Sequence, residues 1–433
     1  MGKRTEKFLM VLVFLLLFCC GCGKEEEISE AENTVTVDLM QGVQADEMPD
    51  RSGIAEVDSV FYGDTIDFAV DLLKENVKER NGENVIISPV SVLSALAMTA
   101  NGAKEDTQAQ MLSVFAKSQD MDSLNRNMKA WTAGLTDTEE ARLGLANAIW
   151  FQDGEERLTV EESFLKKNAA YYDTDIYKAL FDADTLKNIN AWAAEKTGGK
   201  IKKLVDSMDE DAVMYLVNTV VFDADWGRIY QPHQVSDSVF TDAEGEEEKV
   251  PFMYSTEKTY LEDENATGFI KPYKEGYRFA AILPNQGISP EEYLETIDGE
   301  HFIALLSEAK TEVIVHTGMP KFQSEYETEL SDTLAAMGIE NAFDWKTADF
   351  RGMGTYVDKN IYIDSIIHKT FLSVGELGTE AVAATVEEAV AEAAEEPEEI
   401  EIYQVFLRRP FIYAIVEEET NVPIFIGILN EIT

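Results

Sequence analysis

The sequence predicts one large α+β domain on three observations. First, 45% of the 433 residues are hydrophobic and 10% are aromatic, which is typical of a globular chain with a substantial core. Second, strand-like and helix-like segments are interleaved irregularly from about residue 60 onward. Third, no internal repeat and no proline-rich linker interrupts that part of the chain. A single compact unit is therefore expected over residues 60–433.

The first predicted elements are a helix, a short buried strand and a second helix. Apolar residues recur at steps of three and four over residues 61–77, which predicts an amphipathic helix with Asp64 as its N-cap. Residues 84–87 predict a buried strand. The serine and proline at 88–89 suit an N-cap and a first helical turn, so a helix should follow over 90–100 and stop at the next Asn-Gly pair.

Runs of β-branched and aromatic residues predict the remaining strands. One helical stretch, around residues 189–201, lies between the first two of them. The final two runs are joined by a polar Glu-Glu-Thr-Asn turn, which is typical of a hairpin. The expected strands are residues 146–151, 213–222, 276–284, 312–316, 411–416 and 424–429.

Composition disfavours several function classes. The formal net charge of −46 disfavours nucleic acid, whose binding depends on Lys and Arg at phosphates, and it also disfavours anionic lipid surfaces. None of the four histidines stands at metal-ligand spacing from another, and all three cysteines lie within the first 22 residues, so no metal or other cofactor is expected. No nucleophile elbow or phosphate loop occurs either, and the protein is not expected to be an enzyme.

The N-terminus predicts export and a lipid anchor. A basic start precedes an apolar run over residues 8–18 that is too short to span a bilayer. The Cys-Cys-Gly-Cys-Gly that follows resembles a bacterial lipoprotein processing box with Cys22 as the lipidated residue, although Cys19 stands where leucine is usual. We therefore expect a lipoprotein signal peptide at 1–21 and an acidic, flexible tether at 22–59.

Two other interpretations of this terminus are an ordinary cleaved signal peptide and an uncleaved anchor. Lipidation would place the domain outside the cytoplasm, anchored at a bacterial cell surface. Release of the domain from that surface is also compatible with this prediction. The anchor would then be the only membrane contact. Because the processed chain would keep a single, acylated cysteine, its stability should come from its core and not from disulfides.

The stretch over residues 376–385 combines features of a strand and of an exposed loop. Side chains of a strand alternate between two faces, so Thr379, Ala381, Ala383 and Thr385 would share one face on which every residue is small. The next sixteen residues include eight glutamates and no Lys or Arg, which indicates an exposed, charged loop. A segment able to become a buried strand thus continues into a segment that must stay in water.

This stretch resembles the hinge of the serpins, the superfamily of serine protease inhibitors. Further matches to serpins follow in order over residues 60–430. They are residues 84–91, Asn218 with Trp226, 283–284, 338–343, 348–350, 367–369, 409–411 and 423–427. The resemblance implies a serpin fold with eight or nine helices and three β-sheets. A five-stranded sheet would dominate, and a reactive-centre loop would be exposed at about 376–402.

The resemblance also implies a function. A serpin presents the loop as bait, and the target serine protease attacks it and forms a covalent acyl-enzyme. The cut loop then inserts as a strand into the main sheet before hydrolysis is complete. Insertion needs Gly378 where the backbone turns inward, and small side chains on the face to be buried. A monomer whose partner is a protease is expected.

The resemblance assigns three groups of site residues. The hinge comprises Glu376, Gly378, Thr379, Ala381, Ala383 and Thr385. The shutter, a buried polar cluster beneath the sheet, comprises Ser88, Ser91, Asn218 and His368. The breach, where insertion begins, contains Trp226. Without the resemblance, the same polar residues would be satisfied core groups and the tryptophan would be ordinary core.

The bond that a protease would cut is expected between Glu392 and Ala393, counting seventeen residues from Glu376 in the usual serpin register. Val390, Ala391 and Ala394 are the alternatives. The small apolar residues favour an elastase-like target, whereas Glu392 would suit a glutamate-specific protease. No Lys or Arg lies between residues 369 and 408, which argues against a trypsin-like target.

Two residues depart from the serpin pattern. Leu377 stands where a polar residue is usual, and Glu387 falls on the face that should be buried, so both should slow insertion. The competing function is a non-inhibitory serpin that acts as a surface binding protein, although such members tend to lose the small hinge residues. A solute-binding lipoprotein is a third hypothesis, and it would require a two-lobed sequence.

Overall fold

The computed structural model describes residues 36–45, 57–78, 80, 82–153, 157–379 and 400–432, all within the compact unit Val35–Thr433. These residues form nine α-helices and four sheets of seven, six, four and two strands, which confirms the α+β class. The helices are α1 (Ser59–Lys78), α2 (Pro89–Ala100), α3 (Glu105–Phe115), α4 (Met121–Gly134), α5 (Glu162–Tyr171), α6 (Ala183–Lys196), α7 (Pro290–Leu294), α8 (Gly299–Ser307) and α9 (Ser331–Ala336). Short 3₁₀ helices lie at Pro232–Gln234 and Asn341–Phe343.

The seven-stranded sheet, called the main sheet below, carries the candidate site. In spatial order its strands are β1 (Val37–Asp38), β5 (Asp175–Ala179), β3 (Ala141–Gln152), β6 (Met214–Asp225), β16 (Gly378–Thr379), β15 (Ser365–Val374) and β13 (Phe322–Glu329). β6 is antiparallel to β3 but parallel to β15, and β15 is antiparallel to β13. Five of these strands are long, as predicted, and the two-residue strands β1 and β16 bring the total to seven.

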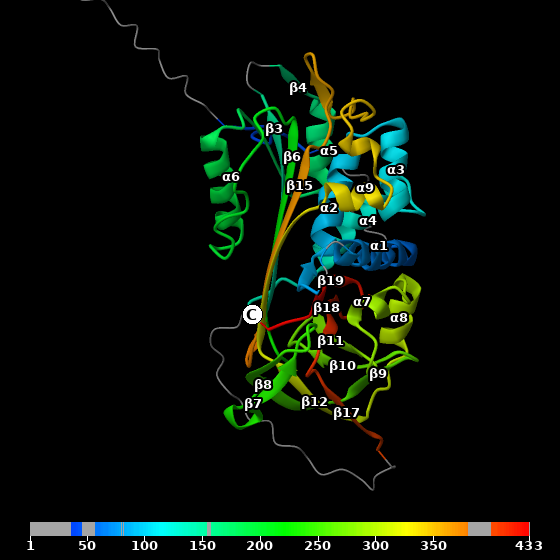
Figure 1. Cartoon of the computed structure of the whole chain (residues 1–433). Coiled ribbons are helices and arrows are strands. Elements are labelled where there is room, and N and C mark those ends of the chain that lie inside the picture. Colours follow the sequence, from blue (N-terminus) through cyan, green and yellow to red (C-terminus); the bar gives the residue numbers. More distant parts are fainter. Residues whose placement is uncertain are drawn as a thin grey trace, which may run out of the picture. The chain divides into compact units, whose positions relative to one another are not determined.

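Helices cover both faces of the main sheet (Figure 1). On one face α6 buries Ile189 and Trp192 against Trp150 and Tyr215 of the sheet. On the other face lie α1–α5 and α9, with α2 closest to β3 and β6. All twelve residues of α2 are buried, which its apolar composition on every side requires.

The six-stranded and four-stranded sheets lie beyond the end of the main sheet at which β16 enters it, and the two-stranded sheet lies at the opposite end (Figure 1). The six-stranded sheet contains β2 (Val85–Ile87), β19 (Pro423–Leu429), β18 (Phe411–Glu417), β11 (Tyr277–Pro284), β10 (Ala266–Pro272) and β9 (Thr259–Glu262). The four-stranded sheet contains β17 (Ile402–Phe406), β12 (Ile314–Pro320), β8 (Glu247–Glu257) and β7 (Val235–Thr241), and β14 (Gly354–Tyr356) pairs with β4 (Leu158–Val160). The predicted C-terminal hairpin is confirmed by the antiparallel pairing of β18 with β19.

A short segment before the first helix belongs to the main sheet. β1 pairs antiparallel with β5, and the backbone N–H of Leu39 donates to the carbonyl of Ile176 at 2.8 Å. The side chains of Leu39 and Val43 pack, partly buried, against the core. The region expected as a tether, 22–59, therefore includes a docked stretch at 36–45, because backbone pairing and a few apolar side chains hold it there.

The N-cap predicted for the first helix is wrong. α1 begins at Ser59, so Asp64 lies inside the helix. The carboxylate of Asp64 instead accepts a hydrogen bond from the N–H of Ser118 at 3.0 Å. Asp58 accepts one from the N–H of Val60 at 3.0 Å, where the helix starts. A partner distant in the sequence explains the acidic residue that local pattern alone assigned to a cap.

Candidate functional site

The chain enters the main sheet at Gly378 and Thr379. These residues form β16 between β6 and β15, antiparallel to both strands. Thr379 lies opposite Ala224 of β6 and Val374 of β15. Over residues 365–370, β15 pairs with β6 directly. We call this direct pairing the seam; a third strand separates β6 and β15 only at the end where β16 enters.

A close backbone contact explains the absence of a side chain at Gly378. A Cβ there would lie 2.0 Å from the carbonyl oxygen of Ala224 and 2.8 Å from the Cα of Asp225. The φ of Gly378 is not positive, so the glycine is needed for this approach and not for a left-handed turn. The inward course of the chain thus depends on the missing Cβ.

We expect Gly378→Ala to lower the free energy of unfolding by about 1–3 kcal/mol, because the methyl group would push β16 away from Ala224. Gly375→Ala is the matched control, since no atom lies within 4 Å of its Cβ position. Urea denaturation measures the difference. Equal midpoints for the two variants would contradict the steric explanation.

Thr379 points into a closed site. It is fully buried, and its hydroxyl oxygen lies 2.6 Å from the phenolic oxygen of Tyr273. Tyr273 stacks on Trp226 with ring centroids 4.4 Å apart. Burial raises the pKa of Tyr273, so its hydroxyl keeps its proton at physiological pH. The site accepts a small side chain and offers it one polar partner.

The segment after β6 holds the residues next to β16. The backbone N–H of Trp226 donates to the carbonyl of Leu377 at 2.8 Å, and that of Tyr230 donates to the carbonyl of Glu376 at 2.9 Å. The indole N–H of Trp226 donates to the carbonyl of Gly375 at 2.9 Å. Trp226 is fully buried and therefore binds the chain through both its backbone and its ring.

An ion pair adds to these contacts. The ammonium of Lys321 lies 2.8 Å from the carboxylate of Glu376, and both side chains are about a third exposed. Partial burial acts to raise the pKa of Glu376, but the hydrogen bond and charge of Lys321 outweigh it and lower the pKa. A pair at this exposure contributes at most about 1 kcal/mol, so the backbone contacts dominate.

A buried polar cluster crosses the seam. Ser88, Ser91, Asn218 and His368 are all 0% exposed. His368 lies opposite Asn218 in the register of β15 and β6, and its Nδ1 is hydrogen-bonded to Asn218 Oδ1. The N–H of Ser88 donates to His368 Nε2 at 3.1 Å, and the hydroxyl of Ser91 donates to Asn218 Oδ1 at 3.4 Å. The structure brings together all four residues predicted for the shutter.

These contacts fix the charge state of His368. Since Nε2 accepts from the N–H of Ser88, it carries no proton, and Nδ1–H must donate to Asn218. Burial lowers the pKa of His368 to about 3. Within the described ranges, Ser88 Oγ and Asn218 Nδ2 find no hydrogen-bond partner, which is costly for buried polar atoms. The cluster holds a neutral imidazole and is incompletely satisfied.

A family model described as "Serpin (serine protease inhibitor)" matches residues 64–432, which is most of the chain. The chain belongs to the serpin family. Serpins in general inhibit serine proteases and are not catalytic enzymes. The serpin fold implied by the sequence is thereby confirmed, with nine helices among the described residues.

Three similar proteins illustrate how far the likeness extends. An "uncharacterized serpin-like protein" of Methanosarcina acetivorans is 30% identical, over 99% of this chain and 97% of its own length. The leukocyte elastase inhibitor of Xenopus laevis is 30% identical over 73% of this chain and 86% of its own. The crystal structure of the thermophilic serpin tengpin in the native state has a TM-score of 0.85 at 40% identity, covering 92% of this chain and all of tengpin.

The structure places the predicted site residues of this serpin in two groups. Glu376, Gly378, Thr379 and Trp226 meet where β16 enters the sheet, and the shutter lies on the seam farther along the same strands. The remaining predicted residues lie outside the described part of the chain. These are Cys22, Ala381, Ala383, Thr385, Val390, Ala391, Glu392, Ala393 and Ala394.

Sequence reasoning missed the residues against which the serpin hinge packs. Tyr273, Tyr230 and Lys321 each contact it, but from segments 106, 146 and 55 residues away in the chain. No local sequence pattern indicates such partners. One feature did point to Tyr273: it directly follows Pro272, which ends the apolar strand β10. Lys271, also unpredicted, contacts the segment that follows β6 through the carbonyl of Arg228.

Two further observations concern only the residues described. Among them, no group of three or more His, Cys, Asp or Glu side chains is arranged to hold a metal ion. No helix in those ranges combines the length and the apolar character needed to cross a bilayer.

Proposed function

We propose that this serpin is a suicide inhibitor that traps the acyl-enzyme of a serine protease by inserting its cleaved loop into the main sheet. The observation that carries the proposal is the pairing of Thr379 between β6 and β15. It gives the loop an entry point and a direction, because a strand that continues from Thr379 runs antiparallel to both neighbours. Those neighbours must then separate along the seam.

Continuing the register of β16 predicts where loop residues lie after insertion. Each step along the loop is one step back along β6, so Ala381 would lie opposite Phe222 and Thr385 opposite Asn218, with Ala383 between them. Phe222 and Asn218 are at most 1% exposed. The small side chains on this face of the hinge therefore suit positions that point into the core.

Insertion would also open the shutter. In the same register Thr385 would lie between Asn218 and His368, which are hydrogen-bonded to each other across the seam in the native state. The hydroxyl of Thr385 could then accept from Asn218 Nδ2, an atom without a partner among the described residues.

The expected gain from insertion is as large as the stability of a domain. About a dozen inserted residues, each gaining roughly 0.5–1.5 kcal/mol net from hydrogen bonds, would release on the order of 10 kcal/mol. Ordinary domains unfold at a cost of about 5–15 kcal/mol. The native state should therefore be metastable relative to the cleaved, inserted form.

Glu387 should limit insertion. The register would set it opposite Leu216, an apolar residue that is 0% exposed. Burying an unpaired carboxylate is costly. We expect Glu387→Ala to raise the ratio of covalent complex to cleaved inhibitor at least twofold, measured on denaturing gels. A lower ratio would contradict this register.

For the cleaved bond we propose the one between Glu392 and Ala393, with Val390, Ala391 and Ala394 as the alternatives. An elastase-like protease is the favoured target. The small apolar residues around the bond and the similarity to a leukocyte elastase inhibitor support it. A glutamate-specific protease is the second candidate, supported by Glu392.

Incubation of the full chain with an elastase-like protease, and separately with a glutamate-specific one, tests the proposal. We expect a covalent band on denaturing gels and a released C-terminal fragment whose first residue identifies the bond. Cleavage by both proteases without any covalent band would remove the inhibitor proposal and favour a non-inhibitory, surface-binding serpin.

We further propose that a lipid on Cys22 holds the domain outside the cytoplasm at a bacterial cell surface. About fifteen residues separate Cys22 from β1, so the lipid would lie at most roughly 50 Å from the main sheet. Labelled palmitate should enter the full chain in a bacterial host but not Cys22→Ser. Equal labelling of the two would contradict the anchor.

A further inference from the structure

A buried ion pair lies beneath the segment that holds the hinge. The ammonium of Lys271, in β10, is 2.9 Å from a carboxylate oxygen of Glu257, the last residue of β8. The two side chains are 1% and 10% exposed. Burial lowers the pKa of Lys271, and the charge of Glu257 opposes that shift. Such a pair often adds nothing to stability compared with apolar residues of the same size, so its presence calls for another explanation.

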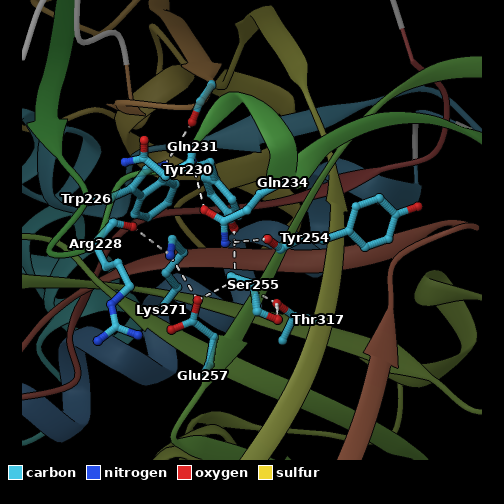
Figure 2. A network of polar contacts seen from close by, with 11 residues as sticks. Trp226, Arg228, Tyr230, Gln231, Gln234, Tyr254, Ser255, Glu257, Lys271 and Thr317 are labelled. Atoms are coloured by element: carbon cyan, nitrogen blue, oxygen red, sulfur yellow. Dashed lines mark hydrogen bonds and ion pairs between the residues drawn. The ribbon is translucent and has the colours of Figure 1, made fainter. Parts of the chain in front are cut away.

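The ammonium of Lys271 touches the same residues that bind the hinge. It donates to the carbonyl of Arg228 at 3.1 Å and lies 4.4 Å from the ring centroid of Tyr230 and 5.4 Å from that of Trp226. Figure 2 shows it between these rings and the Glu257 carboxylate. The backbone N–H groups of Trp226 and Tyr230 are the donors to the hinge carbonyls. One buried ammonium group therefore contacts segment 226–230 at its first, third and last residues.

The carboxylate of Glu257 extends the contacts to the four-stranded sheet. It accepts from the hydroxyl of Ser255 at 2.5 Å, and Ser255 Oγ lies 2.9 Å from Thr317 Oγ1 on β12 (Figure 2). β12 pairs in turn with β17, the strand that follows the loop. The network thus joins segment 226–230, which follows β6, to β10 of the six-stranded sheet and to β8 of the four-stranded sheet. It therefore links segment 226–230, which binds the chain before the loop, to β12, which pairs with the strand after the loop.

We propose that Lys271, held by Glu257, is a positioning residue for loop insertion: it fixes segment 226–230 so that the hinge stays docked between β6 and β15. This inference rests on the proposed inhibitory function. A docked hinge shortens the path to insertion, because the first strand pairs already exist when the loop is cut. Loss of the cation frees the segment, delays insertion and gives hydrolysis of the acyl-enzyme more time.

The test compares the full chain with the variants Lys271→Met and Lys271→Met/Glu257→Gln. The double variant leaves no buried unpaired charge, so it should fold even where the single one does not. Lys178→Met is the matched control. Lys178 forms a partly buried ion pair with Asp153 at 2.8 Å, and this pair lies at the end of the main sheet opposite to β16. Two quantities are measured: hydrogen exchange in peptides containing Trp226 and Tyr230, and the ratio of covalent complex to cleaved inhibitor.

For the double variant we expect hydrogen exchange in those peptides to be at least tenfold faster and the ratio of complex to cleaved inhibitor to fall at least threefold. Lys178→Met should change neither quantity. Unchanged exchange in a folded double variant would overturn the proposal. An unchanged ratio of covalent complex to cleaved inhibitor, together with faster hydrogen exchange, would also overturn it. If the wild-type chain formed no covalent complex, the proposed function would fail, and the exchange measurement would still decide whether Lys271 docks the hinge.

Discussion

Thr379→Arg should convert the inhibitor into a substrate. Thr379 is 0% exposed between Ala224 and Val374, with its hydroxyl against Tyr273. An arginine at this position would bring a charge into a buried site beside Tyr273, which costs several kcal/mol, so β16 would leave the sheet and the loop would be cut but could not insert. We expect the fraction of attacked molecules trapped as covalent complex to fall at least tenfold. The rate of cleavage should stay within about twofold.

Thr379→Ser is the matched control for that prediction. It keeps a small side chain and a hydroxyl in reach of Tyr273, so trapping should remain close to wild type. Both variants are measured with the same protease on denaturing gels, with cleaved and complexed inhibitor quantified separately. Undiminished trapping by Thr379→Arg would show that insertion does not begin at β16, and the proposed mechanism would then be untenable.

The hinge shows what the sequence could and could not predict. The alternation of small residues from Thr379 onward predicted a strand between close neighbours, because side-chain period is a local property. The need for Gly378 where the backbone turns inward came from the resemblance to serpins and not from this alternation. The structure adds the physical reason, a contact with the Ala224 carbonyl, which the sequence could not show because close approach of two backbones leaves no mark on local pattern. Tyr273 was missed for the same reason.

The N-terminal half repeats this contrast. The apolar runs that became β3, β6 and α2 were predictable, because burial on one or all sides demands apolar residues at fixed spacing. Asp64 was misassigned because its partner, Ser118, lies far along the chain. The docking of β1 was unpredictable because an acidic segment with few apolar residues satisfies its backbone at a sheet edge. Contacts between distant segments, not local propensity, determined the role of Asp64 and the docking of β1.

The native state should lose stability in mild acid through His368. The pKa of this histidine falls from about 6.5 when unfolded to about 3 in the fold because burial excludes the charged form. Between these two values the unfolded chain binds a proton that the folded chain does not. The free energy of unfolding is therefore undiminished above pH 6.5, and it falls by about 1.4 kcal/mol per unit as pH drops below that value. From pH 8 to pH 5 the loss from this group is about 2 kcal/mol.

Protonation of His368 would weaken the shutter, the polar cluster that crosses the seam between β6 and β15. A proton on Nε2 would oppose the N–H of Ser88, and the His368–Asn218 bond spans the seam that must open for a strand to enter. Urea denaturation at pH 8, 6.5 and 5 should show wild type losing about 2 kcal/mol more than His368→Gln across this range. Ser91→Ala removes a hydroxyl from the same cluster without removing a titrating group, so its curve should lie lower than wild type but run parallel to it. Parallel curves for wild type and His368→Gln would instead mean that the imidazole binds its proton as readily in the fold as in the unfolded chain, and Nε2 would then not accept from the N–H of Ser88.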